Sequence, residues 1–432
     1  MPLPDREPMQ TAFTQTPAPR MTAMEAAVSG TAAPGTAAPQ LANPQMTAPD
    51  YSAEIGTDLA AFLARCELLA GPTTSPFHSA AWLRAWYEVF APGTSSGSGL
   101  EPLFVTVRHR ADSREQRDAL LLPLVSRRQA GLRVVKFADQ GVVDYNAPVV
   151  ARDWHGGHAP ERAAPALWAA VRQALRGYDL FQVHKLLPRL LDEAGNMPNP
   201  LALALTGRPC QMFGNQFAVR GDWQAWRNSL DRHTRKEIER SWRVFQRSDT
   251  ARFERVTDVQ EALVLFETLE RQQSARLAER TPNYAGDTPR FKAFYRKALA
   301  AGVEGGSVVL TVLRDGEHVV SALFGLANGE RYIGLRQSIN AADTWRPCSP
   351  GRLLDEQTAR HMHEQGLLYF DFGIGDYFHK QALKMQMIPL LDVCQALSWR
   401  GLPLALAWEL RQRLQSLAWL VSLKRRLWPR RV

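Results

Sequence analysis

Two stretches of this 432-residue chain predict the same succession of helices and strands. In residues 51–210, apolar side chains at helical spacing come first, followed by two strand-like runs joined by a polar turn, and then by a strand, a helix and a strand. Residues 211–400 repeat that order. Because a repeated order of elements indicates duplicated structure, we predict an α/β (α+β) fold of two tandem units. Each unit should contain a mixed, mostly antiparallel sheet flanked by helices.

The hairpin of the second stretch is the strongest local signal. The runs Ser307–Arg314 and His318–Leu326 flank an Asp315-Gly316 turn, a pair typical of tight β-hairpins. In the first stretch, Trp82–Phe90 has helical spacing, and Ser79 is the expected N-cap of that helix. A single long, charged helix is expected over residues 223–246.

The two ends of the chain differ in composition from its body. Residues 1–50 are rich in Ala, Pro, Thr and Gly and have almost no aromatic side chains, so we expect them to be disordered. Residues 401–432 are predicted as a basic amphipathic helix, with Leu410, Leu414, Leu417 and Val421 at helical spacing. Such a helix either docks on an anionic membrane or on a partner, such as a synthase complex, or packs on the protein body.

Most of the net charge of +9 comes from this C-terminal segment. After Glu409 the sequence has seven basic residues and no acidic one, and without those seven, 45 basic residues stand against 43 acidic ones. A near-neutral body argues against a nucleic-acid partner. The four cysteines are isolated in the sequence, which indicates reduced cytoplasmic thiols and no metal site.

The segment 349–380 combines an anion-binding element with titratable side chains. Ser349-Pro350-Gly351 begins a predicted helix, and the free N–H groups and dipole at such a start attract anions. A short apolar run, Leu367–Phe370, follows the helix and leads into a loop that contains glycines and acidic residues. The sequence therefore predicts an anion site and titratable groups about one helix apart.

Three residues of that loop are candidate catalytic residues. Asp371 and Asp376 are candidate general bases, because a carboxylate can take the proton from a group that attacks a substrate. The alternative for Asp371 is that its carboxylate orients the loop backbone. Lys380 either binds phosphate or polarises the reacting carbonyl, or it is a solvated charge.

The strand before this segment is expected to supply substrate contacts from Tyr332, Arg336 and Gln337. The alternation of a strand places Tyr332 and Arg336 on one face and Gln337 on the other. Arg336 either contacts the substrate or forms a structural ion pair. No metal is expected at this site.

A basic stripe lies at helical spacing in residues 232–243. It either holds an anionic acceptor, such as a nucleotide-linked sugar, or belongs to a solvated helix with ion pairs to interspersed glutamates. Its members are Arg232, Lys236, Arg240 and Arg243.

Several strings, by their order and spacing, resemble the CelD/BcsL-like acetyltransferases, a GNAT and FemAB-like group linked to cellulose and exopolysaccharide synthesis. They are SPFHSAAWLRAWYEVF at 75–90, LLLPLVSRRQAGLRVVKF at 120–137, VDYNAPVV at 143–150, LDRHTRKEIERSWRVF at 230–245, DGEHVVSALFGL at 315–326 and the segment 349–380. The similarity extends from about residue 51 to residue 399. It implies two GNAT-like folds and transfer of an acyl group, in the simplest case acetyl, to an amine or hydroxyl of a sugar or glycoconjugate.

The resemblance also implies where the acyl donor binds. In such domains the pyrophosphate of CoA lies on backbone N–H groups at a helix N-terminus, and the matching positions here are Arg346, Ser349, Gly351 and Arg352. Acetyl-CoA or another acyl-CoA is thus the expected donor. The expected location is the cytoplasm, with or without a peripheral contact to the inner face of the membrane.

Two further functions stay open at this point. One is a FemAB-like aminoacyltransferase that uses charged tRNA, although a tRNA contact should show a basic face on the folded body. The other is a catalytically silent accessory protein of a polysaccharide synthase complex, which would use the fold and the basic C-terminal segment as a scaffold.

Overall fold

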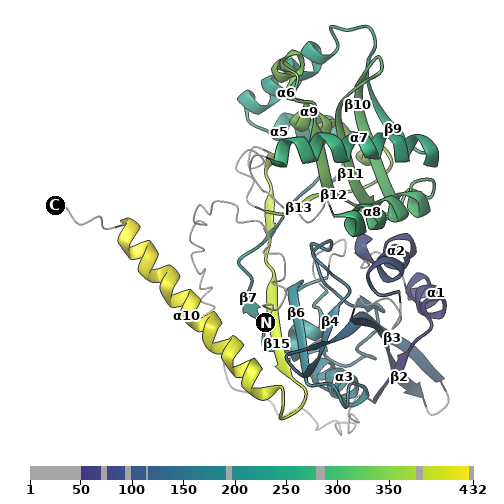
Figure 1. Ribbon diagram of the computed structural model, residues 1–432, viewed down its shortest axis with the longest axis vertical. Coiled ribbons are helices and arrows are strands. Elements are labelled where there is room, and N and C mark those ends of the chain that lie inside the picture. Colours follow the sequence, from purple (N-terminus) through teal and green to yellow (C-terminus); the bar gives the residue numbers. More distant parts are fainter. Residues whose placement is uncertain are drawn as a thin grey trace, which may run out of the picture.

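The two halves of the chain build sheets with the same pattern of strand directions. The computed structural model describes residues 50–69, 75–92, 99–112, 115–190, 197–278, 288–375 and 383–427. Within these residues the strands form an eight-stranded and a seven-stranded sheet, and Figure 1 shows them one above the other. The predicted fold class, two mixed sheets flanked by helices, is confirmed. Residues 1–49 lie outside the described part.

The first sheet has the strand order β1-β2-β3-β4-β6-β15-β7, and β5 pairs with β3. The β4–β6 pair is parallel and the other pairs are antiparallel. Its strands are β1 (Tyr51–Gly56), β2 (Leu100–Asp112), β3 (Glu115–Gln129), β4 (Leu132–Phe137), β5 (Val149–Val150), β6 (Leu180–Leu186), β7 (Arg208–Pro209) and β15 (Leu391–Ala396).

The second sheet has the order β14-β8-β13-β12-β11-β10-β9, again with one parallel pair, β12–β13. The predicted hairpin is confirmed as β10 and β11, which turn at Asp315 and Gly316. Its strands are β8 (Gly214–Ala218), β9 (Ala251–Val256), β10 (Val308–Asp315), β11 (His318–Ala327), β12 (Arg331–Ile339), β13 (Tyr369–Ile374) and β14 (Gln386–Ile388).

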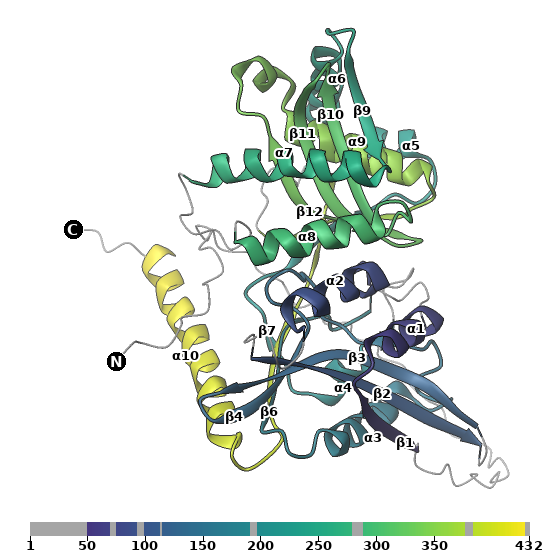
Figure 2. The ribbon, with the colours of Figure 1, turned by 45° about the vertical axis from the view of Figure 1, so that its right-hand side comes forward.

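Helices cover both faces of each sheet. In the first unit, α1 and α2 lie on one side of the strands and α3 on the other, and in the second unit α7 and α8 lie opposite α5, α6 and α9 (Figure 2). The helices are α1 (Leu59–Leu69), α2 (Ala80–Phe90), α3 (Pro160–Ala174), α4 (Pro200–Ala204), α5 (Trp223–Ser229), α6 (Arg232–Phe245), α7 (Val259–Ala278), α8 (Pro289–Gly302), α9 (Pro350–Glu364) and α10 (Leu402–Leu427), with 3₁₀ turns η1 (Pro76–His78) and η4 (Asp343–Cys348).

Two helix predictions have different outcomes. Ser79 caps α2 as expected, because its side chain accepts from the N–H of Trp82. The single helix expected over residues 223–246 is wrong: the chain breaks into α5 and α6. Leu230 is extended there, and the Asp231 side chain accepts from the N–H of Thr234, which starts a new helix.

The last strand of the second unit joins the first sheet. β8, at the start of the second unit, pairs with β13 of the second sheet, whereas β15, at its end, pairs with β6 of the first sheet. Residues 391–396 were assigned by sequence to the second domain, so the predicted division at residue 400 does not follow the sheets. The periodicity of a strand reports which face is buried and not which sheet it joins.

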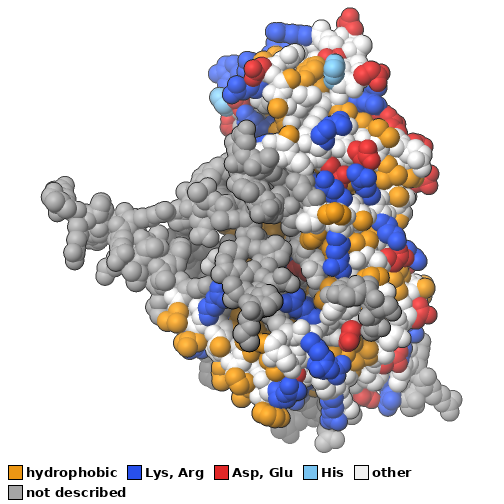
Figure 3. Space-filling model, in the orientation of Figure 1, with side chains coloured by type: hydrophobic (Ala, Val, Ile, Leu, Met, Phe, Trp, Pro, Cys, Tyr) orange, Lys and Arg blue, Asp and Glu red, His pale blue; other side chains and the backbone are white. Residues whose placement is uncertain are grey.

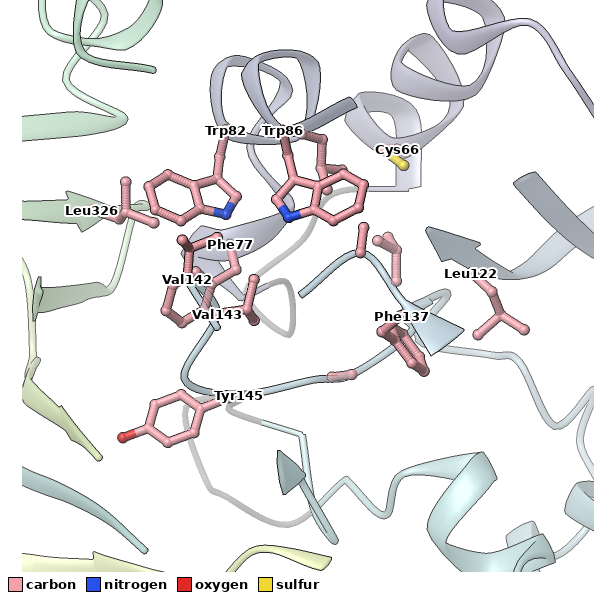
Figure 4. Packing of buried hydrophobic residues seen from close by; sticks show 14 of the residues in the cluster. Cys66, Phe77, Trp82, Trp86, Leu122, Phe137, Val142, Val143, Tyr145 and Leu326 are labelled. Atoms are coloured by element: carbon pink, nitrogen blue, oxygen red, sulfur yellow. The ribbon is translucent and has the colours of Figure 1, made fainter. Parts of the chain in front are cut away.

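A continuous hydrophobic core joins the units where α2 packs on α8. The Trp82 ring meets that of Phe294 edge-on at 4.7 Å, and Phe90 lies 5.3 Å from Phe291. Figure 4 shows Trp82 beside Leu326 of β11, with the ring of Tyr145 reaching from the first unit toward the strands of the second. The halves are thus fixed to each other by side-chain packing as well as by the pairing of β15 with the first sheet.

Candidate functional site

The second sheet opens between its two parallel strands. β12 and β13 pair only at Arg331–Tyr369, Tyr332–Phe370 and Ile333–Asp371, and beyond those pairs β13 continues beside β8. Among the described residues, β12 has no ladder pairing with β13 beyond Ile333. An extended ligand can pair with the backbone of β12 on that side.

The start of α9 lies at the end of β12, next to this opening. Ser349 has a left-handed backbone (φ +47°), Pro350 is the first helical residue, and α9 has no side-chain cap. An added Cβ at Gly351 would lie 2.8 Å from Cδ1 of Ile339, so only glycine fits without a shift. An uncapped helix start offers N–H groups and the positive end of the helix dipole to an anion.

Gln337, expected to bind substrate, holds this helix in place. Its Nε2 donates to the carbonyl of Gly351 at 2.9 Å and to Oδ1 of Asp355 at 2.8 Å. The side chain therefore faces α9. The structure supports a positioning contact between strand and helix.

The two arginines assigned to the donor differ in their surroundings. The Arg346 side chain, in η4, is 85% exposed and forms an ion pair with Asp343 at 3.6 Å. Arg352, in the first turn of α9, donates to Oε2 of Glu237 on α6 at 2.9 and 3.0 Å. α6 packs against both η4 and α9, so the basic stripe predicted on α6 lies at the same end of the second unit.

The expected alternation along β12 is wrong because of a β-bulge. Phe324 pairs with Arg336, and the next residue, Gly325, pairs with Gly334, so Leu335 has no opposite residue in the ladder. The extra residue reverses the faces that follow it. Tyr332 packs in the cluster beneath α9, whereas Arg336 faces α7.

Arg336 is buried within the second unit. Its Nε donates to Oε1 of Gln273 at 2.8 Å, and its Nη1 lies 3.9 Å from Oε1 of Glu270. Its guanidinium lies over the rings of Tyr295 and Phe266. Of the two roles that the sequence left open for Arg336, the structural ion pair is the one these contacts support. Tyr332 is buried too.

Asp371 lies fully buried where the two units meet. Its Oδ1 accepts hydrogen bonds from the hydroxyl of Tyr145 at 2.8 Å and from the N–H of Gly373 at 2.7 Å. Its Oδ2 lies 3.8 Å from Nη1 of Arg331, which is itself buried and also donates to Gln216 of β8. Burial lowers the pKa of Arg331, and the charge of Asp371 opposes that change.

Asp144, in the same loop as Tyr145, binds the end of β13. Its Oδ2 accepts from the N–H of Ile374 at 3.1 Å. Gly373 has φ +71°, and an added Cβ there would lie 2.2 Å from that oxygen, so the close approach requires glycine. Burial raises the pKa of Asp144 to about 7, with smaller raising effects from Asp371 and Asp139 and lowering effects from Lys185 and the Ile374 hydrogen bond.

An ion pair of the buried Lys185 with the partly buried Asp139 fixes this loop of the first unit. Nζ of Lys185 lies 3.0 Å from Oδ2 of Asp139 and also donates to the carbonyl of Val143. The side chain of Asn146 donates to Asp139 and to the carbonyl of His184. The loop carrying Asp144 and Tyr145 is therefore held from both ends.

Asn215 of β8 holds the other side of the chain that leaves β13. Its Nδ2 donates to the carbonyl of Gly375 at 2.7 Å and to that of Gly373 at 3.3 Å. Gly375 is the last described residue before the loop that contains two predicted catalytic residues. Those two, Asp376 and Lys380, lie outside the described residues.

The sequence predicts a catalytic role for Asp371 but none for Asp144 or Tyr145. Both belong to the string VDYNAPVV, which contributed only to a family resemblance. Tyr145 and Asp371 are separated by 226 positions, and no spacing rule connects residues that far apart. The one local signal is that polar side chains interrupt an otherwise apolar run.

Metal ligands are not grouped in the part of the chain that the structure describes. No cluster of three or more His, Cys, Asp or Glu side chains there could hold an ion. The four cysteines are free thiols.

The parted strands lie in a region that is similar to a known protein family. Residues 232–381 match the family described as acetyltransferase (GNAT) domain. A search of the curated proteins by sequence found no match. The matched residues include β12, β13 and α9.

One solved structure, FemX, shares the fold over most of the chain, and two others align less well. FemX aligns with 83% of this chain and 100% of its own at a TM-score of 0.54 and 12% identity. The C-terminal domain of a putative lysylphosphatidylglycerol synthetase from Agrobacterium fabrum aligns at 0.45 and 12%, covering 81% and 96%. A tandem GNAT protein from the clavulanic acid biosynthesis pathway aligns at 0.42 and 11%, covering 81% and 99%. At these identities the likeness to FemX concerns the fold alone.

Proposed function

We propose that this protein is an acyltransferase that moves an acyl group, in the simplest case acetyl, from acyl-CoA to an amine or hydroxyl. One observation carries the proposal: within a region that matches the GNAT domain family, the parted strands β12 and β13 lie next to the uncapped start of α9. A thioester donor has an extended arm and an anionic pyrophosphate. The opening suits the arm, and the helix start suits the pyrophosphate.

The donor would be held by the residues at the start of α9. The backbone N–H groups near Ser349 and Gly351 would bind the pyrophosphate, and Arg346 and Arg352 would add charge-assisted hydrogen bonds. Arg352 is already oriented by Glu237, and Arg346 is exposed and available to an anion. The cations of α6 would raise the local concentration of an anionic donor.

The acceptor would lie where the first unit meets the end of β13. An attacking amine must lose a proton, and Asp371 and Asp144 are the carboxylates at that place. We assign proton removal to Asp371, with Asp144 holding the chain that leads to Asp376 and Lys380. In this arrangement the first unit supplies part of the catalytic site.

The finer assignments rest on the resemblance to CelD/BcsL-like acetyltransferases. They are a sugar or glycoconjugate acceptor, a role in cellulose or exopolysaccharide synthesis, and action in the cytoplasm. The acceptor is to be identified by assay of candidate amino sugars and nucleotide-linked sugars once donor binding is established.

Calorimetric titration with acetyl-CoA and longer acyl-CoAs tests the donor site. The wild-type protein should bind, and Arg346→Glu/Arg352→Glu should weaken binding by roughly tenfold or more, since each arginine loses a charge-assisted contact to phosphate. Arg110→Glu is the matched control, because Arg110 is an exposed, ion-paired arginine of the first unit. Thermal unfolding should show that both variants are folded.

The titration also separates the alternatives. If the wild-type protein binds no acyl-CoA, the proposal fails and a non-catalytic accessory protein becomes the better explanation. If aminoacyl-tRNA binds instead, the protein is an aminoacyltransferase.

A further inference from the structure

The C-terminal helix α10 turns its apolar side away from the protein. Leu402, Leu406, Leu410 and Leu414 recur every four residues and are 49%, 59%, 59% and 56% exposed. Trp399, just before the helix, is 83% exposed. Figure 3 shows the hydrophobic patch at the lower left of the molecule, where the first part of α10 lies in Figure 1.

The opposite side of the helix rests on the first unit. Ala405, Trp408, Glu409 and Gln412 are partly buried at spacings of three and four residues. The carboxylate of Glu409 accepts from Nε of Arg208 at 3.0 Å, and the helix begins next to β15. A helix of a soluble protein normally buries its apolar stripe, so this orientation is reversed.

Positive charge follows the apolar face of α10 in the sequence. The sequence after Glu409 contains seven Lys and Arg residues and no Asp or Glu. A second copy of this chain on the same face would bring two such basic segments together, which like-charge repulsion opposes. Apolar side chains beside cations fit the surface of an anionic bilayer, where the leucines enter the acyl boundary and the cations meet the headgroups.

The form of the helix suits lying on a bilayer. α10 has 26 residues, so it is about 39 Å long. None of the helices in the described residues is apolar enough over a sufficient length to cross a membrane. In Figures 1 and 2 the helix runs along the flank of the first unit, and its far end leaves the body.

We propose that α10 is a peripheral membrane anchor that binds the surface of an anionic bilayer through Leu402, Leu406, Leu410 and Leu414. Binding to lipid requires only the helix and its charge, and therefore does not depend on acyl transfer.

Co-sedimentation with lipid vesicles tests the anchor. The full chain should sediment with vesicles of equimolar phosphatidylcholine and phosphatidylglycerol, much less with phosphatidylcholine alone, and less at high salt. Leu406→Glu/Leu410→Glu should reduce partitioning by roughly tenfold or more. The variant replaces two leucines that would be buried in the lipid with negative charges, which the anionic lipid repels. Leu68→Glu/Val264→Glu, at exposed apolar positions of α1 and α7, should bind like the wild-type protein.

Three results would overturn the anchor. One is a wild-type protein that does not sediment with the anionic vesicles. Another is equal partitioning of the wild-type protein and Leu406→Glu/Leu410→Glu. The third is a dimer in sedimentation velocity that this variant dissociates while vesicle binding is absent, which would assign the face to a second copy.

Discussion

Asp371→Ala should lower the free energy of unfolding by about 3–5 kcal/mol, the range found when one partner of a buried ion pair is removed. The substitution leaves Arg331 buried without the carboxylate that faces it at 3.8 Å. It also takes the acceptor from the Tyr145 hydroxyl and the Gly373 N–H, which links the two units. Urea unfolding followed by tryptophan fluorescence measures the loss.

Asp371→Asn separates stability from chemistry. The asparagine oxygen can still accept from Tyr145 and Gly373, so this variant should lose less stability than the alanine variant. If Asp371 removes the proton from the acceptor, acyl transfer should fall about 100-fold or more while acetyl-CoA binding stays unchanged. A transfer rate like that of the wild-type protein would contradict a catalytic role, and an alanine variant as stable as Asp343→Ala, an exposed control, would contradict the buried pair.

Asp144→Asn should stabilise the protein above pH 7. The folded pKa of Asp144, about 7, lies above its ordinary value of 3.8, so between pH 4 and 7 the folded state binds more protons than the unfolded chain. The contribution of Asp144 to the free energy of unfolding is therefore fully present below pH 4 and is lost as the pH rises to 7. Above pH 7 the free energy of unfolding no longer changes because of this group. Asparagine carries no charge and can still accept from the N–H of Ile374, so the variant avoids a cost of at most about 4 kcal/mol.

Unfolding free energies at several pH values between 5 and 8 measure this effect. The difference between Asp144→Asn and the wild-type protein should grow with pH and level off above 7. Asp343→Asn makes the same chemical change at an exposed side chain and should leave the pH dependence unaltered. If Asp144→Asn has the same pH dependence of stability as the wild-type protein, then ionising Asp144 does not destabilise the folded state.

The fold was predictable where local pattern decides it. The Asp315-Gly316 turn between two apolar runs predicted the β10–β11 hairpin, and the same element order in both halves predicted two similar sheets. The pairing of β15 with the first sheet was not predictable, because the apolar pattern of a strand does not tell which sheet it joins. The break between α5 and α6 depends on one side-chain cap, which helical periodicity alone does not reveal.

The site was only partly predictable for a related reason. Residues 346–352 are neighbours in the sequence, so the start of α9 could be found from its turn chemistry. The face of Arg336 depends on one unpaired residue, Leu335, whose bulge becomes visible only when the partner strand is known. The contacts of Asp144 and Tyr145 with β13 join the two halves of the chain, and local sequence patterns cannot predict contacts between residues so far apart.

The central claim is that the opening between β12 and β13 and the start of α9 bind an acyl-CoA. Amide hydrogen exchange with and without saturating acetyl-CoA tests this most directly, since bound backbone N–H groups exchange more slowly. With acetyl-CoA bound, we expect slower exchange in residues 349–354 and in β12 beyond Ile333, and little change in β1 to β3. Slower exchange confined to the first unit, or none in the second, would contradict it.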